Sequence, residues 1–306
     1  MTPVSIVIPV RNEGDRVSRT VKSIVAGRSR PFPLEIVIVD DASSDGCCET
    51  VPETIKGYDH VRLVLRRLDH WSGIPYARNR GVESSTFPIC LLTDGNTRFP
   101  EAWDIQIWNH FCRGRILAGT IADMASSFRG YGCTLLLPSM GVSWIPMAGP
   151  YHGYVPVASS ACTVISRTMF HQLGGYDETL PLYGAAEPEF SVRAWLSGYE
   201  IVNIPDLVIY HWFRPRPDYD NFRSPIRPIM LRNYLRFACY YLPTDLLHRA
   251  YNYFTELMPS DFEVVLRTLI ETGVWNRRID LQRRLPRDFS WLVRQFSLTC
   301  STAVVP

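Results

Sequence analysis

Three segments of the chain place carboxylate or amide side chains directly after a short apolar run. The first run continues into residues 9–13, the second into Asp40 and Asp41, and the third into Asp94 and Asn96. Asp94 and Asn96 are two residues apart, so in an extended segment their oxygen atoms lie on the same side. Such a pair suits a hard divalent cation that bridges phosphate groups. The tripeptide Asp-Gly-Asn is also a common turn, and by itself it favours the turn.

The aspartates after the second run allow two interpretations. Carboxylates at the end of a strand can accept hydrogen bonds from a nucleobase N–H or from ribose hydroxyls. They can equally cap a turn in which Gly46 takes a left-handed conformation. Both interpretations stay open for Asp41, whereas Asp45 is expected to cap the turn.

The elements that would position these residues alternate between strand and helix. Apolar, β-branched runs predict strands at residues 4–10, 34–39, 61–65 and 89–93, and helical periodicity predicts helices at residues 15–26 and 75–83. This alternation, with nearly continuous apolar strands, indicates a parallel sheet covered by helices. Ligands of such sheets bind at the carboxyl ends of the strands, so the polar residues that follow the strands are the expected ligand-binding residues.

The middle of the chain continues the pattern with one irregular interruption. Helices are expected at residues 100–112, from Arg167 and at 187–196, and strands at residues 116–121, 161–166, 200–204 and 207–210. Pro100 is expected in the first turn of its helix. Residues 126–156 are rich in glycine, proline and aromatic side chains. A long irregular segment within a compact domain is usually functional or mobile.

Four motifs together resemble glycosyltransferase family 2 in their order and spacing. They are residues 4–13, residues 39–46, the triplet 77–79 and the triplet 94–96. The second half, from the Leu-Gly-Gly-Tyr-Asp-Glu segment at 173–178 to His-Trp-Phe-Arg at 211–214, is even more similar to the polypeptide N-acetylgalactosaminyltransferases of family 27. The resemblance implies an α/β GT-A fold over residues 1–215, with a mostly parallel central sheet flanked by helices. A helical C-terminal extension at 216–306 would follow.

This resemblance implies a glycosyltransferase that uses a nucleotide-diphosphate sugar. Its expected nucleotide-binding residues are Pro9, Val10, Arg11, Glu13, Asp40, Asp41, Arg78, Asp94 and Gly95. A carboxylate such as Asp41 that accepts the N–H of uracil discriminates against adenine, whose N1 is itself an acceptor. We therefore expect a uridine diphosphate (UDP) sugar as the donor.

The family resemblance also implies a divalent cation, Mn²⁺ or Mg²⁺, bound by Asp94, Asn96 and His211. His211 could alternatively pack between Trp212 and Phe213 at the end of a strand. Asn96 stands where relatives carry a charged or imidazole ligand, and a neutral amide should weaken metal binding.

Glu187 is the expected general base. Relatives carry an acidic pair before the helix that contains the arginine matching Arg193, and this chain has Ala186 and Glu187 there. In inverting relatives an acid in this region deprotonates the acceptor, and Glu189 is the second candidate. Carboxylates at a helix start also favour the helix dipole, and Glu189 could instead pair with Arg193 one turn later. Family 2 enzymes mostly invert and family 27 enzymes retain, so the stereochemistry stays open.

Two other functions are compatible with parts of this pattern. A sugar nucleotidyltransferase shares the α/β layout, but its first loop is glycine-rich and basic, whereas residues 9–14 hold one glycine and an acid. An inactive nucleotide-sugar-binding module of the same fold remains an alternative because Asn96 and Ala186 replace acidic residues of the family. Donor hydrolysis would distinguish this module from an active enzyme.

Composition excludes several classes of protein. Hydrophobic residues make up 46% and charged residues 20% of the chain, as in an ordinary globular protein, and the net charge of +2 does not favour nucleic acid. Eight cysteines without a CxxC pair are typical of reduced thiols in a cytosolic protein. With neither a signal peptide nor an 18-residue apolar stretch, we expect a cytoplasmic protein.

The basic C-terminal segment raises the question of membrane contact. Residues 221–306 hold 12 arginines and seven acidic residues. A predicted helix at 231–242 carries an apolar stripe of Leu231, Leu235, Ala238 and Leu242 with arginines beside it, as an interfacial helix does. It also suits a helix docked on the catalytic domain with its arginines in solvent, which we expect, with peripheral contact at the inner face of the membrane as the alternative. The acceptor is a glycan, a lipid-linked compound, a peptide or a small natural product, and we expect residues 126–156 to bind it.

Overall fold

The computed structural model describes residues 2–300 of the chain. Its strands are β1 (Val4–Val10), β2 (Leu34–Asp40), β3 (Val61–Arg67), β4 (Ile89–Leu92), β5 (Thr97–Arg98), β6 (Arg115–Asp123), β7 (Arg129–Gly130), β8 (Cys133–Leu136), β9 (Gly141–Trp144), β10 (Thr163–Ser166) and β11 (Glu200–His211). Its helices are α1 (Arg16–Ala26), α2 (Val51–Thr54), α3 (Ile74–Ser84), α4 (Trp103–His110), α5 (Arg167–Leu173), α6 (Ala186–Leu196), α7 (Arg216–Arg223), the 3₁₀ turn η1 (Ser224–Ile226), α8 (Arg227–Tyr241), α9 (Thr244–Leu257), α10 (Phe262–Glu271), α11 (Val274–Arg284) and α12 (Phe289–Phe296).

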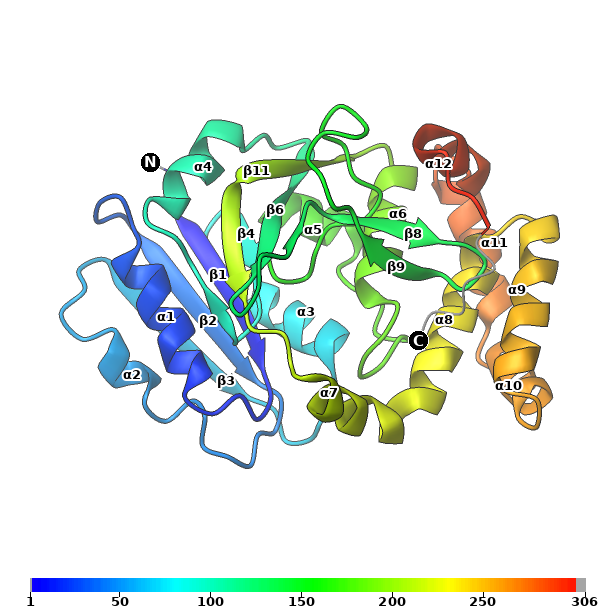
Figure 1. Cartoon of the computed structure of the whole chain (residues 1–306), viewed down its shortest axis with the longest axis horizontal. Helices are drawn as coiled ribbons and strands as arrows, with labels where there is room; N and C mark the ends of the chain where they lie inside the picture. Colours follow the sequence, from blue (N-terminus) through cyan, green and yellow to red (C-terminus); the bar gives the residue numbers. More distant parts are fainter. Residues whose placement is uncertain (1, 301–306) are drawn as a thin grey trace.

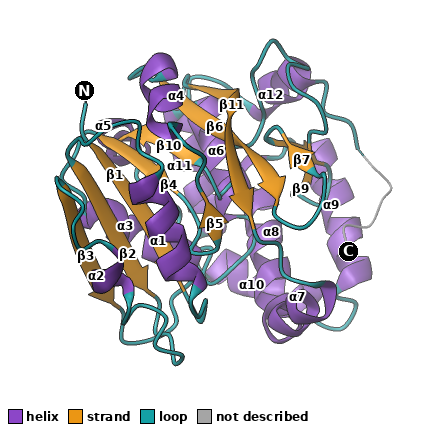
Figure 2. Ribbon diagram, turned by 60° about the vertical axis from the view of Figure 1, so that its left-hand side comes forward, coloured by secondary structure: helices purple, strands orange, loops and turns teal. Residues whose placement is uncertain are grey.

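A central mixed sheet organises the first two thirds of the chain (Figures 1 and 2). Its strand order is β3-β2-β1-β4-β10-β6-β11-β5, with β7 paired to β6. Strands β1, β2, β3 and β4 are parallel, as are β6 and β11. Strand β10 runs antiparallel to both β4 and β6 and so separates the two parallel groups. The sheet is mostly parallel as predicted, and the reversed β10 is its main departure from that prediction.

Both faces of the sheet are covered, which explains the uninterrupted apolar strands. Ile6 and Ile8 of β1 belong to one buried cluster with the apolar side of α1. Val7, between them, belongs to the opposite cluster together with Ala77 of α3. Because successive side chains of a strand point to opposite faces, a strand buried on both sides must be apolar at every position.

Three expected elements differ from the structure. Helix α4 begins at Trp103, and Pro100 lies outside it because Ala102 has a left-handed backbone with φ of 55°. The expected strands at 200–204 and 207–210 form the single strand β11, with an irregularity between Ile204 and Val208. The irregular segment at 126–156 contains the short hairpin β8–β9.

The C-terminal helices pack into the core of the α/β part. Leu235, Ala238 and Leu242 are fully buried in the same cluster as Val7 of β1. Docking was therefore the right expectation, but Arg236, which we expected in solvent, is buried and donates to the Thr272 hydroxyl at 2.8 Å. Helix α11 covers this side of α8, where Arg278 donates to the Cys239 and Leu242 carbonyls.

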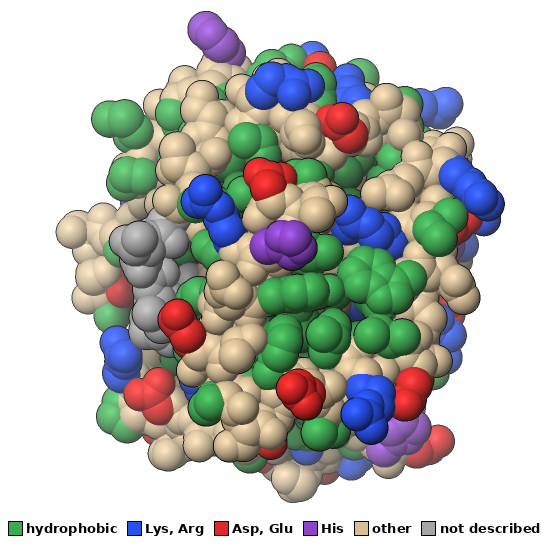
Figure 3. All heavy atoms as spheres, turned by 90° about the vertical axis from the view of Figure 1, so that its right-hand side faces the viewer, with side chains coloured by type: hydrophobic (Ala, Val, Ile, Leu, Met, Phe, Trp, Pro, Cys, Tyr) green, Lys and Arg blue, Asp and Glu red, His purple; other side chains and the backbone are tan. Residues whose placement is uncertain are grey.

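The outer face of these helices carries both apolar and charged side chains. Figure 3 shows hydrophobic side chains gathered in the middle of this face, with basic and acidic ones around them. Within residues 2–300, no helix has the length and apolar character needed to cross a membrane.

Candidate active site

A cavity of about 780 Å³ lies at the carboxyl ends of β1, β4 and β11. Its walls include most of the residues expected to bind a ligand: Pro9, Val10, Arg11, Glu13, Asp41, Arg78, Asp94, Gly95, Asn96, Glu187 and His211. Asp40 and Glu189 are not among the residues that line it. The structure thus brings together residues from the start of the chain to the end of β11.

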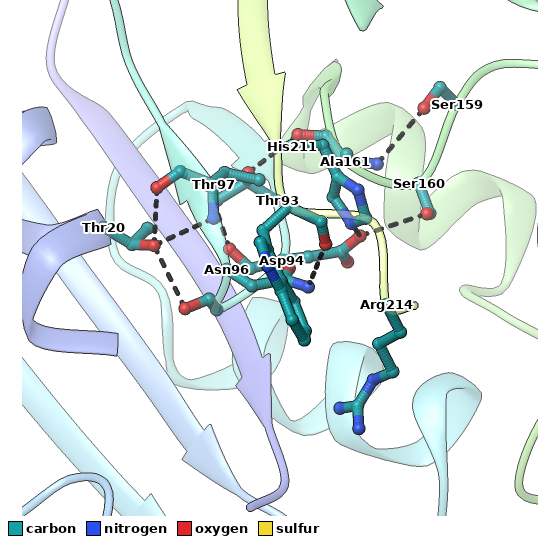
Figure 4. Close-up of polar contacts among 12 residues, drawn as sticks. Thr20, Thr93, Asp94, Asn96, Thr97, Ser159, Ser160, Ala161, His211 and Arg214 are labelled. Carbon is teal, nitrogen blue, oxygen red and sulfur yellow. Dashed lines mark hydrogen bonds and ion pairs between the residues drawn. The ribbon is translucent and has the colours of Figure 1, made fainter. Parts of the chain in front are cut away.

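Asp94 and His211 face each other inside this cavity (Figure 4). The distance from Asp94 Oδ2 to His211 Nε2 is 3.6 Å, and the Ser160 hydroxyl lies 3.3 Å from the same oxygen. Asn96 follows in the same turn, and its amide nitrogen donates to the Trp212 carbonyl at 3.0 Å. That bond leaves the amide oxygen as the atom of Asn96 that can bind a cation.

The turn that carries Asp94 is fixed by buried threonines. The Thr20 hydroxyl of α1 donates to the Gly95 and Thr97 carbonyls, at 3.0 Å and 2.7 Å, and accepts the Thr97 N–H. The Thr97 hydroxyl donates to the Asp94 carbonyl at 3.0 Å. The backbone after β4 is therefore held rigidly, which fixes the position from which the Asp94 carboxylate enters the cavity (Figure 4).

His211 has the properties of a metal ligand. Burial lowers its pKa, and the nearby charge of Asp94 only partly opposes this, so the imidazole is neutral at neutral pH. Its Nδ1 atom is buried and has no hydrogen-bond partner within residues 2–300. Neutral imidazole, carboxylate and amide oxygen together form a set that Mn²⁺ or Mg²⁺ accepts. Among the described residues, no group of three His, Cys, Asp or Glu side chains is placed to hold a metal ion.

Arg78 connects two carboxylates of the cavity, those of Asp94 and Glu187. It is fully buried in α3; its Nη2 donates to Asp94 Oδ1 at 3.0 Å and its Nη1 to Glu187 Oε1 at 2.6 Å. Its Nη2 also lies 3.3 Å from the Ser160 carbonyl. The sequence predicted that Arg78 binds the nucleotide; in the structure Arg78 lines the cavity and bonds to both the aspartate and the glutamate.

The two carboxylates outside the cavity have structural partners. Glu189 is fully buried; both oxygens accept from Arg193 at 2.8 Å, and one also accepts from the Tyr241 hydroxyl at 2.7 Å. The alternative pairing with Arg193 is thus confirmed, and the geometry favours Glu187 over Glu189 as the site carboxylate. Asp40 accepts the Ser43 N–H at 2.8 Å and lies 3.4 Å from Arg67, which places it in the turn.

Asp41 lines the cavity and also holds a loop. Its two oxygens accept the backbone N–H groups of Ser72 and Gly73, each at 2.7 Å. Burial raises its pKa, and these two bonds act in the opposite direction. Asp45 accepts the N–H groups of Gly14 and Cys47, so its expected role in the turn is confirmed.

Sequence reasoning missed Trp71 and Arg214, which line the same cavity as the predicted residues Arg11 and Glu13. The Arg11 guanidinium stacks over the Trp71 ring at 4.6 Å and donates to the Ala42 carbonyl at 2.9 Å. Glu13 is ion-paired with Arg214, which follows the His211 segment. The Glu13–Arg214 pair joins residues 201 positions apart, so no local pattern could have shown it.

Aromatic side chains form part of the remaining walls. Trp144 of β9 and Phe213 line the cavity with ring centroids 6.2 Å apart, and the His211 ring lies 4.4 Å from that of Phe213. The irregular segment at 126–156 therefore does reach the site. On the other side the cavity is lined by Tyr183 and, from the C-terminal helices, by Tyr219 and Tyr234.

Comparison with known sequences identifies a family and several curated relatives. Residues 5–173, more than half of the chain, match the family described as glycosyl transferase family 2. Polypeptide N-acetylgalactosaminyltransferase 8 of Drosophila melanogaster is 28% identical over 258 residues, covering 77% of this chain and 43% of that protein. Probable N-acetylgalactosaminyltransferase 9 of Caenorhabditis elegans is 26% identical over 223 residues, covering 66% of this chain and 38% of that protein. The chain thus spans less than half the length of these two relatives.

Comparison with solved structures supports the expected fold. A crystal structure of GalNAc-T7 with UDP, GalNAc and Mn²⁺ matches with a TM-score of 0.71 at 21% identity, over 97% of this chain and 57% of that one. The mannosyltransferase PcManGT from Pyrobaculum calidifontis, in complex with GDP-Man and Mn²⁺, matches with a TM-score of 0.58 at 18% identity. This match covers 88% of this chain and 75% of the mannosyltransferase chain. These likenesses establish the GT-A architecture.

Proposed function

Because this chain belongs to glycosyl transferase family 2, we propose that it transfers a sugar from a UDP-sugar to the hydroxyl group of an acceptor. Asp94, Asn96 and His211 would hold a divalent cation, Mn²⁺ or Mg²⁺, together with the donor diphosphate. The GalNAc-T7 structure was solved with UDP and Mn²⁺, which supports this donor and this metal. Because both oxygens of Asp41 already accept backbone N–H groups, the choice of uridine rests mainly on that relative.

One observation carries the proposal. A single buried arginine, Arg78, binds Asp94 on the donor side and Glu187 across the cavity, and His211 faces the same aspartate. A transferase needs a donor site and an acceptor-activating group at a fixed separation, since correct orientation supplies much of the rate enhancement. The Arg78 bridge fixes this separation.

The chemistry follows from these positions. When bound, the cation neutralises negative charge on the diphosphate leaving group. Glu187, whose side chain is 22% exposed, takes the proton of the acceptor hydroxyl as that oxygen attacks the anomeric carbon of the sugar. Attack from the face opposite to the diphosphate gives inversion, with Arg78 keeping Glu187 in place throughout.

Binding of nucleoside diphosphates tests the donor half. We expect UDP to bind more tightly than ADP or GDP in calorimetry, and we expect Mn²⁺ to strengthen UDP binding. The His211→Ala variant should lose most of this metal effect, whereas replacing His171, an α5 residue outside the cavity, by Ala should preserve it. Tighter binding of ADP or GDP, or equal UDP binding with and without Mn²⁺, would contradict the proposal.

An inactive binding module is the second candidate. It is favoured by one observation: the metal set includes the neutral amide of Asn96, and the described residues supply no third acidic, histidine or cysteine ligand. Release of UDP from UDP-N-acetylgalactosamine and UDP-glucose separates the two functions. An enzyme hydrolyses at least one of these donors slowly in water, whereas a module binds UDP and releases none.

A further inference from the structure

The walls around Glu187 indicate which kind of acceptor this site accepts. Arg78 binds Asp94 through one guanidinium nitrogen and Glu187 through the other, so the two carboxylates lie on different sides of it. If the donor occupies the Asp94 side, an acceptor hydroxyl next to Glu187 must enter from the other side. The rest of the acceptor then contacts whatever surrounds Glu187.

Three tyrosines surround this side of the cavity, and we call them the tyrosine cluster: Tyr183, Tyr219 and Tyr234. Tyr183 lies in the loop before α6, Tyr219 on α7 and Tyr234 on α8. Burial raises the pKa of Tyr234 to about 12, with a further contribution from the charge of Glu187. The rings of the three tyrosines offer flat, apolar faces beside the glutamate.

The cavity is also lined by several smaller apolar side chains, together with the polar Ser159, Ser160 and Asn221. The apolar ones are Cys133, Val142, Val157, Ala158, Leu182 and Pro188. A sugar acceptor would need several hydrogen-bond partners for its hydroxyls, and these side chains offer very few. Flat apolar groups, in contrast, gain from stacking on tyrosine rings and from leaving water.

The charged side chains of the cavity also favour an uncharged acceptor. The charged side chains that line the cavity are Arg11, Glu13, Asp41, Arg78, Asp94, Glu187 and Arg214. Each has a partner within the protein: Arg214 pairs with Glu13, Arg78 with both Asp94 and Glu187, and Arg11 and Asp41 bind backbone groups. Four of these side chains are acidic and three are basic, so an acidic acceptor would meet an excess of negative charge, which is unfavourable.

We propose that the acceptor is an uncharged compound whose reacting hydroxyl is attached to a flat, apolar group, such as a phenol or a fused aromatic alcohol, and that the tyrosine cluster selects it. This inference rests on the proposed function. The proposal also assigns a role to α7 and α8, because these helices supply Tyr219 and Tyr234 at the end of the sheet where the site lies (Figure 1).

A matched pair of probes tests the selection. The full-length chain, loaded with UDP and Mn²⁺, is titrated calorimetrically with 2-naphthol and with 6-hydroxy-2-naphthoic acid, which adds only a carboxylate. We expect 2-naphthol to bind and the acid to bind at least about tenfold more weakly, because its carboxylate meets the excess of negative charge in the cavity. Equal binding of the two overturns the inference, as does binding of a threonine peptide or of methyl glucoside without binding of 2-naphthol.

A variant pair tests the residues. Tyr219 lies on α7, which has no buried residue, so Tyr219→Leu should fold normally. We expect this variant to bind 2-naphthol about tenfold more weakly. Tyr251→Leu, a half-buried tyrosine of α9 outside the cavity, is the matched control and should bind it like the unaltered chain. Unchanged binding by Tyr219→Leu would refute the role of the cluster.

The UDP titration distinguishes a failure of the proposed function from a failure of the inference about the acceptor. If the unaltered chain with Mn²⁺ does not bind UDP, the proposed function itself fails. If it binds UDP but not 2-naphthol, only the inference about the acceptor fails.

Discussion

At the scale of single residues, the buried guanidinium of Arg78 determines how the site is arranged. It contacts both Asp94 and Glu187, and its own side chain is 1% exposed. Without it, the two carboxylates would lose their shared counter-charge. Removing one member of a buried charge cluster leaves the others uncompensated, which costs more than the intact cluster contributes.

Replacing Arg78 should therefore destabilise the fold. For Arg78→Met we expect a loss of about 3 kcal/mol in the free energy of unfolding, measured by urea denaturation. Arg80→Met is the matched control: Arg80 lies on the same helix and pairs with Glu83 and Glu178 near the surface, where such pairs contribute about 0–1 kcal/mol. Equal losses in the two variants would mean that Arg78 has no special structural role.

Glu187 is expected to act in catalysis and only weakly in donor binding. Glu187→Gln keeps the shape of the side chain and removes its capacity to take a proton, so transfer to an acceptor should slow by about 10²–10⁴-fold. Its affinity for UDP with Mn²⁺ should change little, because the donor lies on the Asp94 side of Arg78. Proton NMR of the product gives the anomeric configuration. Retained configuration, or undiminished turnover by Glu187→Gln, would rule out this glutamate as an inverting base.

The protonation state of His211 predicts how metal binding depends on pH. Burial lowers the pKa of His211 below its usual value of about 6.5. Only the neutral ring can bind a metal, so a lowered pKa preserves the ligand to a lower pH. The Mn²⁺-dependent part of UDP binding should thus be constant from about pH 8 to 6.5 and decline only below that range. A decline that begins above pH 7 in calorimetry would show that another group, or a raised pKa, governs the metal site.

At the scale of elements, a contact between two loops shapes the cavity. Gly73, before α3, pairs with Leu182 in the loop before α6, and its N–H is bound by Asp41. A methyl group on Gly73 would stand 2.1 Å from the Leu182 Cα atom, and φ at Gly73 is 92°. The loop that carries Tyr183 and leads into Glu187 is therefore positioned by a glycine that lies outside it.

The variant Gly73→Ala should separate steric conflict from backbone strain. Gly57 has a similar φ of 81° with open space around it, so Gly57→Ala reports strain alone, about 1 kcal/mol. We expect Gly73→Ala to lose clearly more stability in urea denaturation, because the backbone of Leu182 must also move. It should in addition weaken 2-naphthol binding, which Gly57→Ala should not. Similar losses of stability in the two variants would show that the loop adapts freely.

The sequence predicted regular elements better than the contacts between them. Strands β1 and β2 were predictable because burial on both faces requires apolar residues at every position. The start of α4 was not, because the left-handed backbone of Ala102 has no local signal in an alanine. The Arg78–Glu187 bond joins residues 109 positions apart and depends on the packing of α3 against the loop before α6.

The candidate site was predicted residue by residue only where a family motif reached. Asp94, Asn96 and His211 come from the resemblance, and they do converge on one cavity. Tyr219 and Tyr234 lie beyond the motifs, in helices whose docking no periodicity could specify, so their place in the wall was not foreseen.

At the scale of the whole molecule, the helical extension shares a buried core with the α/β part. Phe237 and Phe296 share a buried cluster with Val7 and Val37 of the sheet. Polar contacts cross the same boundary: Asn233 donates to the Pro181 carbonyl at 2.8 Å, next to the tyrosine cluster. The division at residue 215 therefore marks a change of architecture and not a boundary between independent cores.

A chain that ends at residue 215 should consequently fail to fold. Removing α7 to α12 would expose the apolar side chains that pack on α8, and it would deprive the buried Glu189 of its bond from the Tyr241 hydroxyl. We expect the shortened chain to aggregate or to lack a cooperative urea transition, whereas the full-length chain unfolds in one transition that fluorescence and circular dichroism report at the same midpoint. A shortened chain that is soluble, unfolds cooperatively and binds UDP with Mn²⁺ would show instead that the first 215 residues form an independent domain. In that case the extension would serve the acceptor side alone.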